Sequence, residues 1–160
     1  MHTRTLRCAT VLAIFVALFG IRSAAQATDP IIGTWVLNVA KSKFSPGPAP
    51  KSESRTYVVA GQEIKATSTG VGADGKPTAG EWIIVNDGRD TALTGNPDAD
   101  VLSLKRTDAF STEFTLKKAG KVVITGTRTI SRDGKVMTIT NKGTNAKGQT
   151  INDVLVFEKR

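Results

Sequence analysis

The chain has 160 residues, with 22 Lys and Arg against 14 Asp and Glu, and a formal charge of +8. This length allows one domain with one modest hydrophobic core. The single His and the single Cys are His2 and Cys8, so both lie close to the N-terminus. Loss of that segment would exclude every catalytic or metal site built from imidazole or thiolate.

The first 27 residues have the pattern of an export signal. A positively charged stretch precedes an apolar run over 11–19, and small residues follow, ending in an A-x-A pattern at 25–27. We predict cleavage before Thr28 and export to the periplasm or the extracellular space. The alternative is an uncleaved membrane anchor, but the apolar run is shorter than the roughly 20 residues that a spanning helix needs. We therefore expect no membrane span in the mature chain.

Removing residues 1–27 takes away three Arg and no acidic residue, which leaves 133 residues and a net charge of +5. The mature chain has no His and no Cys. A Ser-His-Asp triad, a Cys-His pair, a zinc site and a disulfide are all excluded. Carboxylates, Lys and the single Tyr57 remain for acid–base chemistry. We expect no enzyme, no cofactor and no metal site, with an enzyme based on carboxylates as the remaining catalytic alternative. The remaining positive charge is scattered, which argues against nucleic-acid binding.

The mature chain, 28–160, predicts a single all-β domain with little or no helix. Apolar residues alternate with a period of two, and Gly, Asn and Asp mark turns between the alternating segments. We predict strands at 32–39, 53–60, 62–70, 78–86, 89–94, 100–107, 110–118, 121–132, 135–143 and 149–159. Short turns join them into an antiparallel up-and-down meander. Closure into a barrel of about eight to ten strands would remove the exposed edges.

One segment, Ala40–Lys51, is irregular. It contains three prolines in five residues, which excludes a helix or a central strand. We expect a short turn at Ala40–Phe44 followed by an extended lid or crossover. The alternative is a linker between domains, but only one predicted strand precedes it.

The alternation also predicts which side chains share a face. One face of 121–131 holds an Arg among apolar residues, and a solvent-facing Arg would not be expected there. Its members are Val122, Ile124, Gly126, Arg128 and Ile130. In 110–118 the shared face holds Phe110, Thr112, Phe114 and Leu116. A barrel of ten strands is too wide for its own side chains to fill, so we expect a cavity for water or a small ligand. The alternative is an interior filled by Phe110, Phe114, Ile124 and Trp82.

Two places in the sequence resemble a known family. The run Gly33-Thr34-Trp35-Val36-Leu37 resembles the opening strand of intracellular fatty-acid-binding proteins, and its G-x-W pattern is shared by lipocalins, within the calycin superfamily. The segments 127–140 and 156–159 resemble the last strands of that family. The resemblance implies a calycin-like barrel that carries a small hydrophobic or amphipathic ligand in its interior. It also implies that Gly33 and Trp35 form the structural signature, with Trp35 closing one end of the barrel.

We expect the ligand to contact Arg128, together with the other residues that the alternation or the resemblance places inside. These are Tyr57, Arg55, Trp82, Arg106 and Phe114. Arg128 could anchor an anionic group through its planar guanidinium. Alternatively it could stack on Trp35 or satisfy buried carbonyls. The competing hypothesis for the whole protein is a structural or interaction barrel of the cell envelope with a filled core and no ligand.

Two charged segments have the composition of turns. Asn96–Asp100 carries two carboxylates, but it lacks the ligand number of a calcium loop, and we predict a turn. Lys117–Lys121 is a basic hairpin tip. It predicts a solvated turn, with weak contact to an anionic envelope surface as the alternative.

Overall fold

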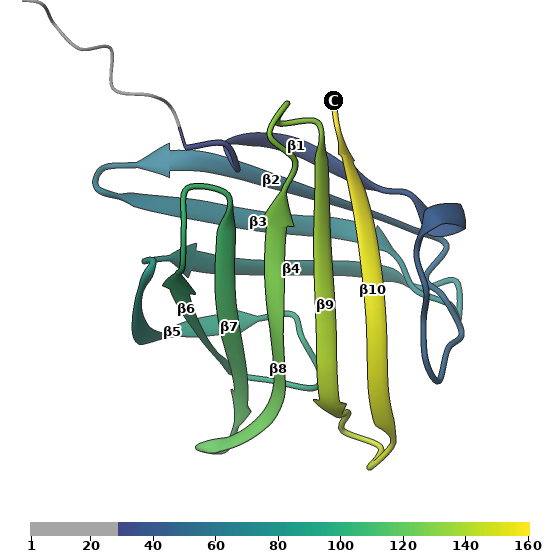
Figure 1. Cartoon of the computed structure of the whole chain (residues 1–160). Coiled ribbons are helices and arrows are strands. Elements are labelled where there is room, and N and C mark those ends of the chain that lie inside the picture. The colour runs from purple at the N-terminus through teal and green to yellow at the C-terminus, as the bar shows by residue number, and fades with distance from the viewer. Residues whose placement is uncertain (1–28) are drawn as a thin grey trace, which may run out of the picture.

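The computed structural model describes residues 29–160, which form one closed antiparallel barrel of ten strands in sequence order (Figure 1). The strands are β1 (Gly33–Leu37), β2 (Ser52–Ala60), β3 (Glu63–Val71), β4 (Pro77–Ile84), β5 (Asp87–Thr94), β6 (Val101–Arg106), β7 (Ser111–Lys118), β8 (Lys121–Ile130), β9 (Val136–Thr144) and β10 (Thr150–Lys159). The one helical element of this region is a single 3-10 turn, η1 (Val39–Lys41).

The predicted fold class is confirmed. All ten predicted strands are present, each within two residues of its expected bounds. The tight turns follow from glycines in the left-handed region, such as Gly120 with φ 77° and Gly134 with φ 70°. No helix in residues 29–160 is long and apolar enough to cross a bilayer. The predicted export signal, 1–27, lies outside the described residues.

The barrel closes because β1 pairs with both β2 and β10, so that Trp35 lies opposite Arg55 on one side and Lys159 on the other. The seam between β4 and β5 is much weaker. These two strands form two registered pairs, Glu81↔Thr94 and Trp82↔Leu93. The other nine seams of the barrel therefore provide most of the hydrogen bonds between strands.

Trp35 packs at the end of the barrel where β1 begins. It is 0% exposed, and its Nε1 donates a hydrogen bond of 2.7 Å to the carbonyl oxygen of Ile31. The ammonium of Lys159 lies 5.1 Å from the centroid of its ring and donates to the carbonyl of Pro30 at 3.0 Å. Gly33 leaves room for this lysine, because a Cβ there would lie 2.9 Å from the Lys159 Cε. Trp35 therefore has the surroundings of a packed core residue.

The irregular segment between β1 and β2 begins with the turn η1 and then runs beside β10. It is not a crossover, because β1 and β2 are directly paired neighbours. After η1, Lys43 exchanges two backbone hydrogen bonds with Val154 of β10, at 2.7 and 2.8 Å. The amide of Ser45 then donates to the Asp153 carboxylate at 2.8 Å. The segment is thus part of the single barrel, and the linker alternative is wrong.

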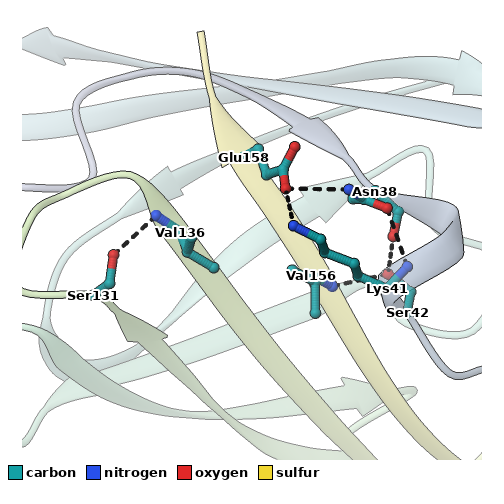
Figure 2. A network of polar contacts seen from close by, with 7 residues as sticks. All are labelled: Asn38, Lys41, Ser42, Ser131, Val136, Val156 and Glu158. Atoms are coloured by element: carbon teal, nitrogen blue, oxygen red, sulfur yellow. Dashed lines mark hydrogen bonds and ion pairs between the residues drawn. The ribbon is translucent and has the colours of Figure 1, made fainter.

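Polar side chains attach η1 to β10 (Figure 2). Glu158 accepts hydrogen bonds from Lys41 Nζ at 2.8 Å and from Asn38 Nδ2 at 3.1 Å. The Ser42 hydroxyl accepts from the Val156 amide at 2.9 Å. Hydrogen bonds from Lys41 and Asn38 hold the pKa of Glu158 below its ordinary value.

Two predicted interior residues face solvent instead. The β7–β8 pairing shifts between Leu116↔Ile124 and Lys117↔Val122, so one extra residue lies in β8. Such a bulge reverses the alternation beyond it, and Val122 is 58% exposed. Phe110 precedes the first residue of β7 and is 36% exposed. Both predictions extended a strict alternation past the point where the regular pairing ends.

Candidate functional site

The barrel contains a cavity of about 560 Å³, within the range of about 300–1,000 Å³ typical of small-molecule sites. Its apolar wall consists of Trp82, Leu93, Leu102, Leu104, Phe114, Leu116 and Ile139. Its polar lining includes Glu53, Arg55, Tyr57, Ser68, Arg128 and Asn141. The expectation that a ten-stranded barrel is not filled by its own side chains therefore holds, although two of the proposed filling residues, Trp82 and Phe114, line the space.

Loops and strand ends form the mouth of the cavity. Its exposed lining residues lie in the β1–β2 connection (Pro48), the β3–β4 turn (Ala73), the β5–β6 loop (Gly95 and Pro97) and the ends of the strands (Ser52, Thr78, Ala79 and Thr94). The β5–β6 loop is held by Asp98, whose Oδ1 accepts a hydrogen bond of 2.7 Å from the Ala146 amide in the β9–β10 turn. This loop therefore forms one lip of the mouth.

Arg128 of β8 is the unusual group in the lining. Its side chain faces inward, as the alternation predicted, and the residue is 6% exposed. Its Nη2 donates a hydrogen bond of 3.1 Å to the buried Thr112 hydroxyl. Among residues 29–160 the guanidinium forms no ion pair with a carboxylate. Burial lowers the pKa of Arg128, because it disfavours the charged form.

Arg55 of β2 also lines the cavity, but its charge is compensated. Its Nε lies 2.6 Å from the Glu53 carboxylate, and its guanidinium carbon lies 4.7 Å from the Phe157 ring centroid and 5.7 Å from that of Trp82. Burial opposes its charged form, but the Glu53 carboxylate and the Tyr57 side chain together outweigh that effect, and the pKa of Arg55 is raised. Its positive charge is therefore fixed and paired.

The cavity lining carries two arginines, Arg55 and Arg128, and two carboxylates, Glu53 beside Arg55 and Asp98 at the mouth. Arg128 forms no ion pair within residues 29–160, and the carboxylate whose charge acts on it, Asp29, is paired with Arg106. Tyr57 lies beside them, 1% exposed, with its ring edge-to-face against Trp82 at 6.1 Å. An isolated buried cation is costly unless something pairs with it. The geometry can therefore accept one anionic group beside an apolar wall.

The structure brings five of the six predicted ligand residues to this cavity: Arg128, Tyr57, Arg55, Trp82 and Phe114. Arg106 is not part of its lining. Arg106 shares a cross-strand row with Thr112 and Arg128, and it forms an ion pair with Asp29, which precedes β1.

Sequence reasoning missed Glu53. The signal was available, because Glu53 is two residues before Arg55 and four before Tyr57, and residues with this spacing share one face of a strand. The Asn96–Asp100 segment forms the predicted turn, with the Asp98 amide donating to the Asn96 side chain at 2.8 Å. Its place at the mouth was not predicted. No group of three acidic, His or Cys side chains within 29–160 has the arrangement of a metal site.

Comparison with solved structures supports the fold. Rv2717c from M. tuberculosis aligns with 82% of this chain and 93% of its own, with a TM-score of 0.50 and 16% sequence identity. A redesigned β-barrel, mFAP1, solved bound to DFHBI, aligns with 82% and 95% of the two chains, with a TM-score of 0.39 and 15% identity. No protein-family model matches the sequence, and no curated protein is significantly similar to it. The likeness to Rv2717c supports the antiparallel β-barrel fold and extends to the fold alone.

Proposed function

We propose that this protein is an exported, non-enzymatic carrier that binds a small amphipathic molecule with one anionic group in the barrel interior. The observation that carries the proposal is Arg128, a buried guanidinium without a carboxylate partner in the described chain, on the wall of a 560 Å³ cavity. The alternative, an envelope barrel with a filled core, is disfavoured by that open volume.

Charge and polarity favour an amphipathic anion over a neutral or cationic ligand. The leucines and aromatic rings of the wall favour an apolar body, because burying apolar surface is favourable. Arg128 favours a carboxylate, sulfonate or phosphate monoester, since guanidinium and these groups form strong charge-assisted hydrogen bonds. Because Arg55 is already paired with Glu53, a single negative group beside Arg128 would give that guanidinium an ion-pair partner.

Export and the absence of catalysis are part of the proposal and rest on the sequence. The pattern of residues 1–27 supports export, and a mature chain without His or Cys supports binding without catalysis. N-terminal sequencing of the protein from the compartment where it accumulates should begin at Thr28. A chain that retains its first residues there would contradict cleavage.

A matched pair of dyes tests binding. 8-Anilinonaphthalene-1-sulfonate and its uncharged parent, N-phenyl-1-naphthylamine, differ by one sulfonate. We expect the anionic dye to bind at least tenfold more tightly, and an alkyl carboxylate to displace it better than the alcohol of equal length. Failure of both dyes to bind would overturn the carrier function. Equal affinity for the two dyes would overturn the anionic specificity.

A further inference from the structure

One end of the barrel is rich in exposed lysines. The β7–β8 and β9–β10 hairpins both project from this end (Figure 1). Lys118, Lys121, Lys142 and Lys147 are exposed there, and none forms an ion pair with a carboxylate of residues 29–160. Val122, which the β8 bulge turns outward, is 58% exposed among them. We call these five residues the basic end.

The acidic groups nearby form no ion pair with these lysines within residues 29–160, although the carboxylates of Asp98 and Asp100 keep their charge and offset two of the four lysine charges. Asp90 pairs with Lys117, at 2.7 Å. The Asp98 carboxylate accepts from the Ala146 amide, and the Asp100 carboxylate accepts from the Ala119 amide at 3.2 Å. These carboxylates are thus engaged with partners other than the four exposed lysines. Lys118 and Lys121 also lie directly opposite each other in the β7–β8 register, where like charges repel unless an anion lies between or beside them.

The basic end adjoins the mouth of the cavity. The β5–β6 loop forms one lip of that mouth, and its Asp98 is bonded to the β9–β10 turn. The same loop ends at Asp100, whose amide donates to the Lys117 carbonyl at 2.9 Å and whose carboxylate bonds to the β7–β8 turn. The lip therefore lies between the two lysine-bearing hairpins.

We propose that the basic end docks on the surface of an anionic lipid bilayer, which places the cavity mouth next to the lipid headgroups. Charge complementarity supports a bilayer as the occupant, because clustered lysines are attracted to anionic headgroups. The exposed Val122 beside them is suited to the boundary between headgroups and acyl chains. Docking does not depend on a ligand. Exchange of an amphipathic ligand with the membrane at the mouth rests on the proposed carrier function.

Vesicle sedimentation tests the docking, using the protein in the form that the cell accumulates and no added ligand. We expect binding to phosphatidylglycerol vesicles, little binding to phosphatidylcholine vesicles, and weakening as salt increases. The double variant Lys118→Gln/Lys121→Gln should reduce the partition coefficient about 30-fold. Both residues are exposed at the tip of the β7–β8 hairpin, and the variant removes a like-charge pair, so the thermal midpoint should not fall.

The matched control is Arg132→Gln/Lys135→Gln. These exposed residues lie in the β8–β9 turn at the opposite end of β8, and the control removes the same charge. Its partition should remain close to that of the unmodified protein. Equal losses in the two variants, or equal binding to both kinds of vesicle, would overturn docking through the basic end. Absence of binding to vesicles would also overturn docking. This holds even if an acidic protein is found to bind these lysines. Dye binding in vesicle-free buffer reports the carrier function separately.

Discussion

Replacing Arg128 by Met separates the cost of a buried charge from its use in binding. Met has a similar length and no charge, so it preserves most of the packing in the cavity wall. The variant loses one hydrogen bond, from Nη2 to the Thr112 hydroxyl at 3.1 Å. It breaks no ion pair with residues 29–160. Stability and anion affinity should therefore change in opposite senses.

The magnitude follows from the surroundings of the guanidinium. Burial lowers the pKa of Arg128, which means that its charged form is less favourable in the folded than in the unfolded chain at neutral pH. Replacing even a buried ion pair by apolar residues is often neutral or stabilising by about 1–4 kcal/mol, and Arg128 forms no ion pair within residues 29–160. This gain in stability is reduced because the variant loses the hydrogen bond to Thr112. It is also reduced because Arg128 borders the open cavity. We expect the free energy of unfolding to rise by about 1–2 kcal/mol.

Guanidinium chloride unfolding measures the stability, and titration with the anionic dye measures the affinity. The dye should bind about 10- to 100-fold more weakly to the variant, which corresponds to loss of one charge-assisted hydrogen bond. Arg132→Gln, at an exposed turn beside the same strand, is the control and should change neither quantity. A variant that is destabilised while its dye affinity is unchanged would refute the reasoning and assign Arg128 to the structural role.

Three further outcomes follow from the structure. Gly126→Ala should destabilise the barrel by about 3 kcal/mol in denaturant titrations, because the new Cβ would lie 1.9 Å from the Thr140 carbonyl oxygen; a loss below about 1 kcal/mol would show that β8 and β9 adjust freely. Glu53→Gln should leave Arg55 unpaired and lower the free energy of unfolding by about 1–3 kcal/mol. Because two unpaired cations then line the cavity, the affinity for a disulfonated dye should improve relative to a monosulfonated one. An unchanged preference between the two dyes would contradict the charge pairing proposed for the cavity. Since the pKa of Glu158 is lowered in the folded chain, its stabilising effect is present at neutral pH and lost as the pH falls, so Glu158→Gln should flatten the acid side of a plot of stability against pH.

Local patterning was sufficient to predict the barrel. Period-two alternation and glycine turns occur in each strand and each tight connection, so ten strands could be placed within two residues. The inward position of Arg128 was also predictable, because Arg128 shares one face of a single strand with Ile124 and Ile130.

Features that depend on pairing between strands were not predictable. The outward turn of Val122 arises from the bulge against β7, and a one-residue shift in pairing leaves no mark on the alternation of β8 itself. The ion pair of Arg106 depends on Asp29, which is 77 residues away in the sequence. The position of Asp98 at the mouth likewise depends on the distant Ala146.

The β4–β5 seam determines where this closed barrel first opens. These strands share two registered pairs, whereas β9 and β10 share nine. Amides of β4 and β5 that point into this seam should exchange with deuterium through local fluctuations, and those of β9 and β10 only through global unfolding. The first partly unfolded state is then a twisted open sheet with β4 at one edge and β5 at the other. In concentrated solution these two edges are the surfaces through which one chain would pair with another.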